Sequence, residues 1–247
     1  MKYNICSVVV VFGDLNQEYL MSWSSSFDHV FLVWNNSFRF NFSVPSNCTV
    51  LCNFNKDYIA GGLNIGIKTA INAGYTNFVL LDSDSFLIKR INFNNFIEIN
   101  ETSVIQFRSN SDLSNKITPL NFIINGLFLS KTIIDNVGYF NTSYIMDLVD
   151  VEFCIRAKLN GFRFFKTDDV YFEHKLGYTN SNALIQTPNY SLFRYKYQFY
   201  NTFKIILDFY FLPHLCGQLL LRRIKYFLRI LFFERNFYSQ LISKKNH

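Results

Sequence analysis

The sequence has no CxxC pair, and its five cysteines (Cys6, Cys48, Cys52, Cys154 and Cys216) are scattered and odd in number. Neither a disulfide framework nor a zinc site is therefore indicated, because both need paired or closely spaced thiols. We expect reduced and mostly buried thiols.

The sequence pattern also indicates no targeting segment and no membrane-spanning segment. The apolar run 8–12 near the N-terminus is short for a signal-peptide core and lacks a small-residue cleavage site. The uncharged run 209–221 is shorter than the ~20 residues that cross a bilayer. No internal repeat and no Gly/Ser linker interrupts the chain. We expect a cytoplasmic protein.

Aromatic residues and basic charge are what the sequence has in excess, and both concentrate toward the C-terminus. Of 247 residues, 19% are aromatic and 49% hydrophobic, enough for a substantial core. Residues 194–247 carry ten Lys and Arg against two Asp and Glu, whereas residues 1–193 are close to neutral, so the formal charge of +6 belongs to the tail. This division predicts a catalytic domain over 1–193, with halves 1–105 and 106–193, and a basic aromatic tail over 194–247.

Short apolar runs alternate with helical patterns through the first half of the chain. Such alternation favours an α/β fold with a mostly parallel central sheet flanked by helices. The second half is less regular, and Asn160-Gly161 marks the end of a helix there. Strands are expected at 5–12, 29–34, 48–53, 78–81, 104–107, 122–129, 162–165 and 170–172, and helices at 63–73 and 150–159.

The sharpest motif is Asp82-Ser83-Asp84, directly after the apolar run 78–81. A buried parallel strand delivers the residues that follow it to the carboxyl edge of the sheet, where open α/β sheets bind ligands. Two carboxylates at that edge suit a hard divalent cation completed by substrate phosphates. A solvated turn is the alternative interpretation.

A second acidic cluster, Asp147, Asp150 and Glu152, lies in apolar surroundings, where carboxylates are costly unless paired, ligating or catalytic. Asp150 is expected at a helix N-cap, and Arg156 is placed to neutralise Glu152 across one helical turn. A capping carboxylate at the mouth of a cleft can also accept a proton. Further on, His174 follows an expected strand and offers an imidazole, although a lone histidine is more often structural.

The tail contains a basic amphipathic pattern. Arg222, Lys225 and Arg229 recur at three- and four-residue steps, whereas apolar residues such as Ile224 and Leu228 fall on the other side of the same helix. This pattern is typical of a helix lying in a membrane interface. The alternative is an ordinary helix that packs its apolar face on the domain.

Taken in order, these segments resemble the inverting glycosyltransferase family 2, and within it the bacterial rhamnosyltransferase-like branch. The similarity spans most of residues 5–201. It is carried by residues 33–37 (VWNNS), 64–67 (NIGI), 81–85 (LDSDS), 125–126 (NG), 138–140 (GYF), 147–156 (DLVDVEFCIR), 174–177 (HKLG) and 194–201.

The resemblance implies a GT-A type nucleotide-sugar-binding fold and transfer of a sugar, with rhamnose the first guess, to a lipid-linked or cell-envelope glycan. It implies Mg²⁺ or Mn²⁺ at Asp84, Asp82 and His174, and Asp150 as general base. Trp34 stands where the family usually has an acidic residue, so the donor stays open among dTDP-, UDP- and GDP-sugars. Donor contacts are expected at Phe12, Trp34, Asn35, Asn64, Asp82 and Ser83, and acceptor-side positions at Asn125, Gly126, Asp147, Glu152 and Arg156.

These expectations place the enzyme peripherally on the cytosolic face of the membrane, with the tail as its contact, and leave open a homodimer. A catalytically silent relative that binds a nucleotide sugar or glycan within an assembly is the main alternative. Nucleic acid is not an expected partner, because the basic residues cluster with apolar ones and form no base-stacking or helix-turn-helix motif.

Overall fold

The structure is a computed structural model that describes residues 4–36, 42–110, 112, 114, 116–174 and 192–233. The chain forms two compact units. The first comprises Met1–Ile145 and Val149–Lys175, and the second comprises Met146–Leu148 and Leu176–His247.

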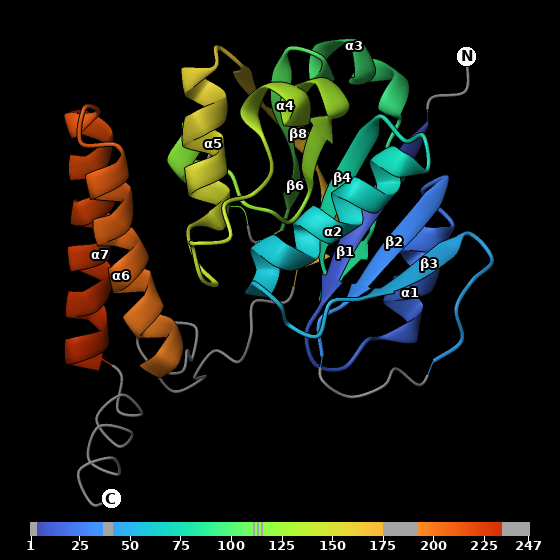
Figure 1. Cartoon of the computed structure of the whole chain (residues 1–247), viewed down its shortest axis with the longest axis horizontal. Helices are drawn as coiled ribbons and strands as arrows, with labels where there is room; N and C mark the ends of the chain where they lie inside the picture. Colours follow the sequence, from blue (N-terminus) through green and yellow to red (C-terminus); the bar gives the residue numbers. More distant parts are fainter. Residues whose placement is uncertain are drawn as a thin grey trace, which may run out of the picture. The chain divides into compact units, whose positions relative to one another are not determined.

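The first unit is built on an eight-stranded sheet with the order β3-β2-β1-β4-β7-β6-β8-β5 (Figure 1). Four of the expected strands in the first half of the chain lie side by side at one end of this order. The strands are β1 (Ile5–Val11), β2 (His29–Trp34), β3 (Cys48–Cys52), β4 (Asn77–Asp82), β5 (Ser85–Leu87), β6 (Ser103–Ser109), β7 (Leu127–Ser130) and β8 (Arg163–His174).

The sheet is mixed: four of its strand pairings are parallel, including β6 with β8, and three are antiparallel, which qualifies the expectation of a mostly parallel sheet. Strands β1 to β4 pair only in parallel with one another, as the alternation with helices predicted. Strand β7 then runs antiparallel to both of its neighbours, β4 and β6, and β5 runs antiparallel to β8. The physical reason is that β5 and β7 are reached through turns and short helical segments, not through a full crossover helix.

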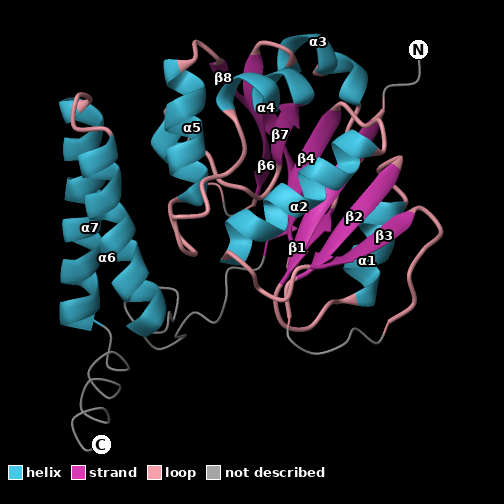
Figure 2. Cartoon of the chain, viewed as in Figure 1, coloured by secondary structure: helices cyan, strands magenta, loops and turns pink. Residues whose placement is uncertain are grey.

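Helices cover both faces of the sheet because the buried strands are apolar on both sides (Figure 2). One face packs against α1 (Gln17–Ser24) and α3 (Ile97–Asn100), where the rings of Trp23 and Phe107 join the core. The other face carries α2 (Tyr58–Asn72), α4 (Lys131–Val137) and α5 (Val149–Leu159). Short 3₁₀ turns, η1 (Phe93–Asn95) and η2 (Pro119–Asn121), complete the unit.

Two glycines on one side of α2 allow this helix to lie unusually close to β1. A Cβ atom added at Gly66 would stand 2.4 Å from Cγ1 of Val8, and one at Gly62 would stand 2.8 Å from Cγ1 of Val10. Because residues four apart share a helix face, the pair forms one flat strip against the strand. This close approach positions the start of α2 over the sheet.

Several expected boundaries differ in the structure. Helix α2 begins at Tyr58, not at residue 63, because Gly61 and Gly62 are helical here despite their low propensity. Of the expected strand 122–129 only the end is extended, as part of β7. The expected strands 162–165 and 170–172 are one strand, β8, whose pairing with β6 shifts register twice.

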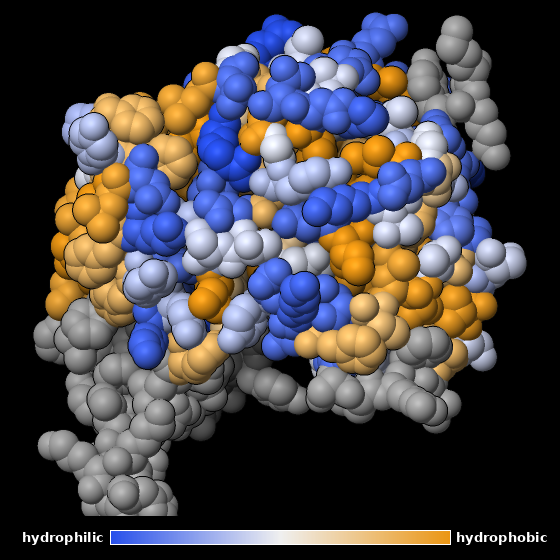
Figure 3. Space-filling view, in the orientation of Figure 1, coloured by the Kyte–Doolittle hydropathy of each residue, from blue (hydrophilic) through white to orange (hydrophobic). Residues whose placement is uncertain are grey.

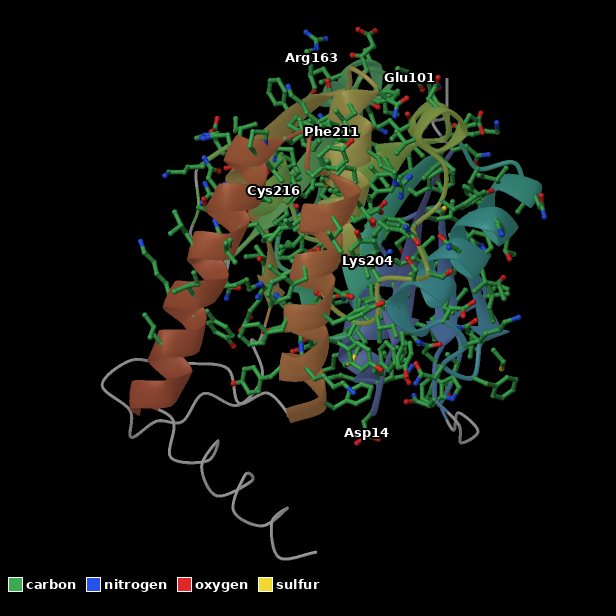
Figure 4. The ribbon with its side chains drawn as sticks, turned by 60° about the vertical axis from the view of Figure 1, so that its left-hand side comes forward. Asp14, Glu101, Arg163, Lys204, Phe211 and Cys216 are labelled. Carbon is green, nitrogen blue, oxygen red and sulfur yellow. The ribbon has the colours of Figure 1, made fainter. Side chains whose placement is uncertain are left out.

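The second unit contains two helices, α6 (Leu192–Asp208) and α7 (Pro213–Phe233), which contact each other and are joined by a short turn. The turn is held by Cys216, whose Sγ lies 3.3 Å from the carbonyl oxygen of Phe209 (Figure 4, where Phe211 and Cys216 are labelled). Hydrophobic side chains remain exposed along both helices, including Phe203, Leu207 and Leu221. We call α6 and α7 the C-terminal hairpin.

The described part of α7 does not test the amphipathic pattern expected in the tail. Ile224 and Leu228 are exposed, and so are Arg222 and Lys225. Arg229 and the apolar positions beyond it lie outside the side chains that the structure describes. No helix among the described residues has both the length and the apolar character needed to cross a bilayer.

Candidate active site

Three potential metal ligands meet where β4, β5 and β8 come together. Asp82 ends β4, Asp84 lies in the tight turn before β5, and His174 ends β8. The antiparallel pairing of β5 with β8 sets Ser85 opposite His174 and so carries the imidazole to the two carboxylates. His174 Nε2 lies 3.2 Å from Asp84 Oδ1 and 3.8 Å from Asp82 Oδ2.

The electrostatics of this trio suit a cation. One ligand atom from each of Asp82, Asp84 and His174 lies within 4.8 Å of the others. Burial lowers the pKa of the His174 imidazole, but its hydrogen bond to Asp84 and the charges of Asp84 and Asp82 outweigh burial, so the pKa lies above its ordinary value. Half of the Asp84 side chain is exposed, which leaves room for a substrate oxygen or water. Two carboxylates with one imidazole fit Mg²⁺ or, better, Mn²⁺.

Buried hydrogen bonds hold the turn that carries the trio. Ser85 Oγ donates to Asn125 Oδ1 at 2.7 Å, and Trp23 Nε1 donates to the Ser85 carbonyl at 2.8 Å. The backbone N–H of His174 donates to Asn110 Oδ1 at 2.9 Å. Ser83, an expected donor contact, is a partly exposed member of this turn. Sequence reasoning missed Ser85 and Asn110, because only the pairing of β8 with β5 and with β6 reveals their positions.

The expected acceptor-side pair Asn125-Gly126 adjoins the same turn. Asn125 is buried, and its Nδ2 has no hydrogen-bond partner among the described residues, although its Oδ1 is engaged by Ser85. Gly126 has φ of +81°, and a Cβ there would stand 2.2 Å from the Phe107 carbonyl oxygen. Glycine is therefore required at this position by both conformation and space.

The expected donor-binding residues follow β1 and β2. Phe12 is largely exposed, whereas Trp34 is buried with its ring 5.6 Å from that of Phe42. Asn35 is buried, accepting from the Asn53 side chain at 2.6 Å and from the Asn55 backbone N–H at 3.1 Å. The structure thus gives Asn35 a role in joining the end of β2 to the turn before α2.

Two further asparagines link segments distant in the chain. Asn64 makes a two-point contact with the backbone of Phe140, donating to its carbonyl at 2.8 Å and accepting from its N–H at 2.9 Å. Asn36 bonds in the same manner to Gly13, with distances of 2.7 and 2.9 Å. Asn64, expected at the donor, is therefore engaged by the loop that precedes the acidic cluster.

The acidic cluster divides into three environments. Glu152 is buried and forms a two-point ion pair with Arg156, which also donates to the carbonyls of Val137 and Tyr139. The helical-turn pairing expected for Glu152 and Arg156 is therefore present. Asp147 forms a two-point ion pair with Arg194, at 3.0 and 3.2 Å.

Asp150 is partly exposed and lies in the first turn of α5, not at its N-cap as expected, because the helix already begins at Val149. Its Oδ1 accepts from the Val151 backbone N–H at 2.8 Å. A carboxylate in the first turn of a helix interacts favourably with the helix dipole. Helix α5 starts at the end of the sheet toward which β1, β2 and β4 run (Figures 1 and 2). This is also the end at which Asp82 leaves β4.

The first unit thus combines a mixed sheet, helices on both faces, and two carboxylates with an imidazole at the end of β4. Among solved structures, the chain is similar to TarS of S. aureus, a GT-A-like glycosyltransferase whose fragment 1-349 was crystallised with UDP. That similarity has a TM-score of 0.50 at 18% identity and covers 70% of this chain and 60% of the TarS fragment. The chain therefore spans less than two thirds of the structure it matches.

Two further TarS structures match at 15% identity with TM-scores of 0.49, covering 82% of this chain and 39% or 65% of TarS. No protein-family model and no curated protein matches the sequence. The structural similarity supports the expected glycosyltransferase fold but not the rhamnosyltransferase-like branch.

Proposed function

We propose that this protein is a metal-dependent, inverting glycosyltransferase that transfers a sugar from a nucleoside diphosphate donor to a glycan acceptor. The observation that carries the proposal is the trio of Asp82, Asp84 and His174 at the carboxyl end of β4 in a GT-A-like sheet. Open α/β sheets bind ligands at this edge, and a diphosphate completes the coordination of a hard cation.

Asp84, Asp82 and His174 would hold the Mg²⁺ or Mn²⁺ ion. When bound, the ion supplies charge neutralisation for the departing nucleoside diphosphate. The protein's own part is to fix the two carboxylates and the imidazole in one place, through the hydrogen bonds of Ser85 and His174 to Asn125 and Asn110.

We assign the general base to Asp150. It would take the proton of the acceptor hydroxyl as that oxygen bonds to the anomeric carbon, while the bond from this carbon to the diphosphate breaks on the opposite face. Asp147 and Glu152, the other acids of the cluster, are each held by an arginine at two points. Both oxygens of each of these two carboxylates already accept hydrogen bonds from a guanidinium group, whereas Asp150 is partly exposed.

The donor we propose to test first is a UDP-sugar, because the TarS fragment was crystallised with UDP. dTDP- and GDP-sugars, and rhamnose as the sugar, follow from the sequence resemblance. The acceptor proposed is a lipid-linked or cell-envelope glycan. The exposed hydrophobic residues of the C-terminal hairpin support peripheral attachment to the cytosolic membrane face through this part of the chain.

The deciding experiment is release of nucleoside diphosphate from a panel of nucleotide sugars with Mg²⁺, Mn²⁺ or EDTA. We expect metal-dependent release, and Asp84→Asn should weaken both Mn²⁺ and nucleotide binding by at least tenfold. Asp169→Asn, on the same strand as His174 and in an exposed ion pair with Lys89, serves as the control. No turnover of any donor, with donor binding unaltered in Asp84→Asn, would overturn the proposal and favour the silent relative.

A further inference from the structure

The segment Met146–Leu148, directly before α5, has an unusual backbone. Met146 and Leu148 both have φ of +65°, in the left-handed region that residues with a Cβ rarely adopt. Neither is a glycine or an asparagine, so the conformation must be imposed by other contacts. These three residues group with the C-terminal hairpin and not with the unit that contains α5.

The contacts come from two residues of α6. Arg194 Nε and Nη2 donate to the two carboxylate oxygens of Asp147, at 3.0 and 3.2 Å. Asn201 Nδ2 donates to the Asp147 carbonyl oxygen at 2.6 Å. Arg194 and Asn201 are seven residues apart, two turns of helix, so they lie on one side of α6. Helix α6 therefore forms hydrogen bonds with both the side chain and the backbone of Asp147.

The contacts of Arg194 and Asn201 with Asp147 are largely buried, and one of them is between opposite charges. The Asp147 side chain is only 13% exposed, and a two-point arginine–carboxylate pair combines charge with fixed direction. Asn201 is fully buried. Removing the arginine would leave a largely buried carboxylate without its counter-charge, so the segment would be driven to rearrange.

We propose that Arg194 and Asn201 are positioning residues for the general base. By holding Asp147 they fix the left-handed backbone on both sides of it, and this backbone sets where α5 begins. Asp150 lies three residues beyond Asp147, in the first turn of that helix. A displacement of about 1 Å at a reacting group costs about a hundredfold in rate. The inference rests on the proposed function of Asp150.

The test is a comparison of full-length Arg194→Gln, Asp147→Asn and the double variant. We expect kcat to fall about a hundredfold in Arg194→Gln with the KM for the nucleotide sugar within about twofold of wild type, because donor binding does not depend on the base. The double variant should lose no more than Arg194→Gln alone, since both changes break one contact. Lys204→Gln, which removes a partly exposed ion pair with Asp208 on the same helix, is the matched control and should keep full kcat.

Amide hydrogen exchange of residues 146–151 gives a readout that does not need turnover. We expect faster exchange in Arg194→Gln and, more mildly, in Asn201→Ser, but not in Lys204→Gln. Faster exchange with an unchanged kcat would overturn the positioning role, as would unchanged exchange. If the wild type transfers no sugar while exchange still responds to Arg194→Gln, the proposed function fails and the hold on the segment stands. Asn201→Ser decides the question if Arg194→Gln does not fold.

Discussion

At the scale of single residues, the three carboxylates Asp147, Asp150 and Glu152 differ in role because their neighbours differ. Asp147 and Glu152 form ion pairs with Arg194 and Arg156 and so stabilise the fold. Asp150 lies partly exposed in the first turn of α5. The chemistry proposed for Asp150 can be separated from the structural roles of the other two by single substitutions.

We predict that Asp150→Asn lowers kcat by about a hundredfold to ten-thousandfold, the range that a general base contributes. The affinity for UDP should stay within about twofold, since the amide keeps the size of the side chain and Asp150 does not serve the leaving group. Isothermal titration with UDP and Mn²⁺, beside nucleotide-release kinetics, measures both quantities. Asp168→Asn, at an exposed position of β8, is the control. An Asp150→Asn enzyme with full activity would contradict the assignment.

The cysteines give a second prediction at this scale. Burial raises the pKa of Cys6 and of Cys154 far above the ordinary thiol range, and raises that of Cys48 to about 11, whereas Cys52 is exposed. Because the thiolate is the reactive form, iodoacetamide at pH 8 should modify Cys52 first and leave Cys6 and Cys154 intact until urea unfolds the chain. Peptide mass spectrometry follows each site, and early labelling of Cys6 would contradict the packing of β1.

The residues of the site differ in how far the sequence could predict them. Asp82 and Asp84 were foreseeable because an apolar strand delivers them to the sheet edge, and His174 because it also ends a strand. The partners of Asn64 and Asp147 lie 76 and 47 residues away, so no local pattern indicates them. The pairing of Glu152 with Arg156 is local and was foreseeable for that reason.

At the scale of elements, α2 and β1 show what the sequence pattern conceals. The helix was expected to begin at residue 63, where the helical spacing of apolar residues begins, yet it begins at Tyr58, and Gly62 and Gly66 are the residues that let it approach Val8 and Val10. Similarly, β5 is only three residues long, and its pairing with β8 decides the position of His174. Short strands and close helix contacts depend on tertiary packing, which overrides local propensity.

Gly66→Ala tests this contact. The added methyl would meet Cγ1 of Val8 at 2.4 Å, so we predict a loss of about 1–3 kcal/mol in the free energy of unfolding, as for other overpacked cores. Gly217→Ala, in α7, meets no atom within 4 Å and should instead stabilise its helix by up to about 1 kcal/mol. Urea unfolding followed by circular dichroism compares the two, and an unharmed Gly66→Ala protein would show that α2 can shift outward at little cost.

At the scale of the whole molecule, the basic and aromatic excess falls in the C-terminal unit. Figure 3 shows hydrophobic side chains on the surface of the C-terminal hairpin. The exposed hydrophobic residues of the hairpin include Leu207 and Leu221. Lys225 and Arg222 are exposed on the same helix as Leu221. Apolar side chains beside basic ones suit a surface of anionic lipid.

We therefore predict that the protein sediments with vesicles containing phosphatidylglycerol and less with vesicles of phosphatidylcholine alone, and that salt weakens the difference. Leu207→Ser with Leu221→Ser should weaken binding at least tenfold, since burying one leucine contributes about 1.5–3 kcal/mol. Ile117→Ser with Leu159→Ser, exposed in the other unit, is the matched control. An equal loss of vesicle binding in both double variants would indicate nonspecific adhesion. Unchanged binding in both would contradict a role of the hairpin.

The contacts of α6 with Asp147 also have a consequence for the order in which the chain folds during its synthesis. Arg194 and Asn201 are made 47 and 54 residues after Asp147, about 2 to 9 s later for the arginine at ordinary rates of translation. The sheet and the trio of Asp82, Asp84 and His174 involve only residues up to His174. Both can therefore be complete while the segment Met146–Leu148 still lacks its contacts with α6. Under the proposed function, a nascent chain would thus be able to bind a nucleotide sugar before its general base is in position.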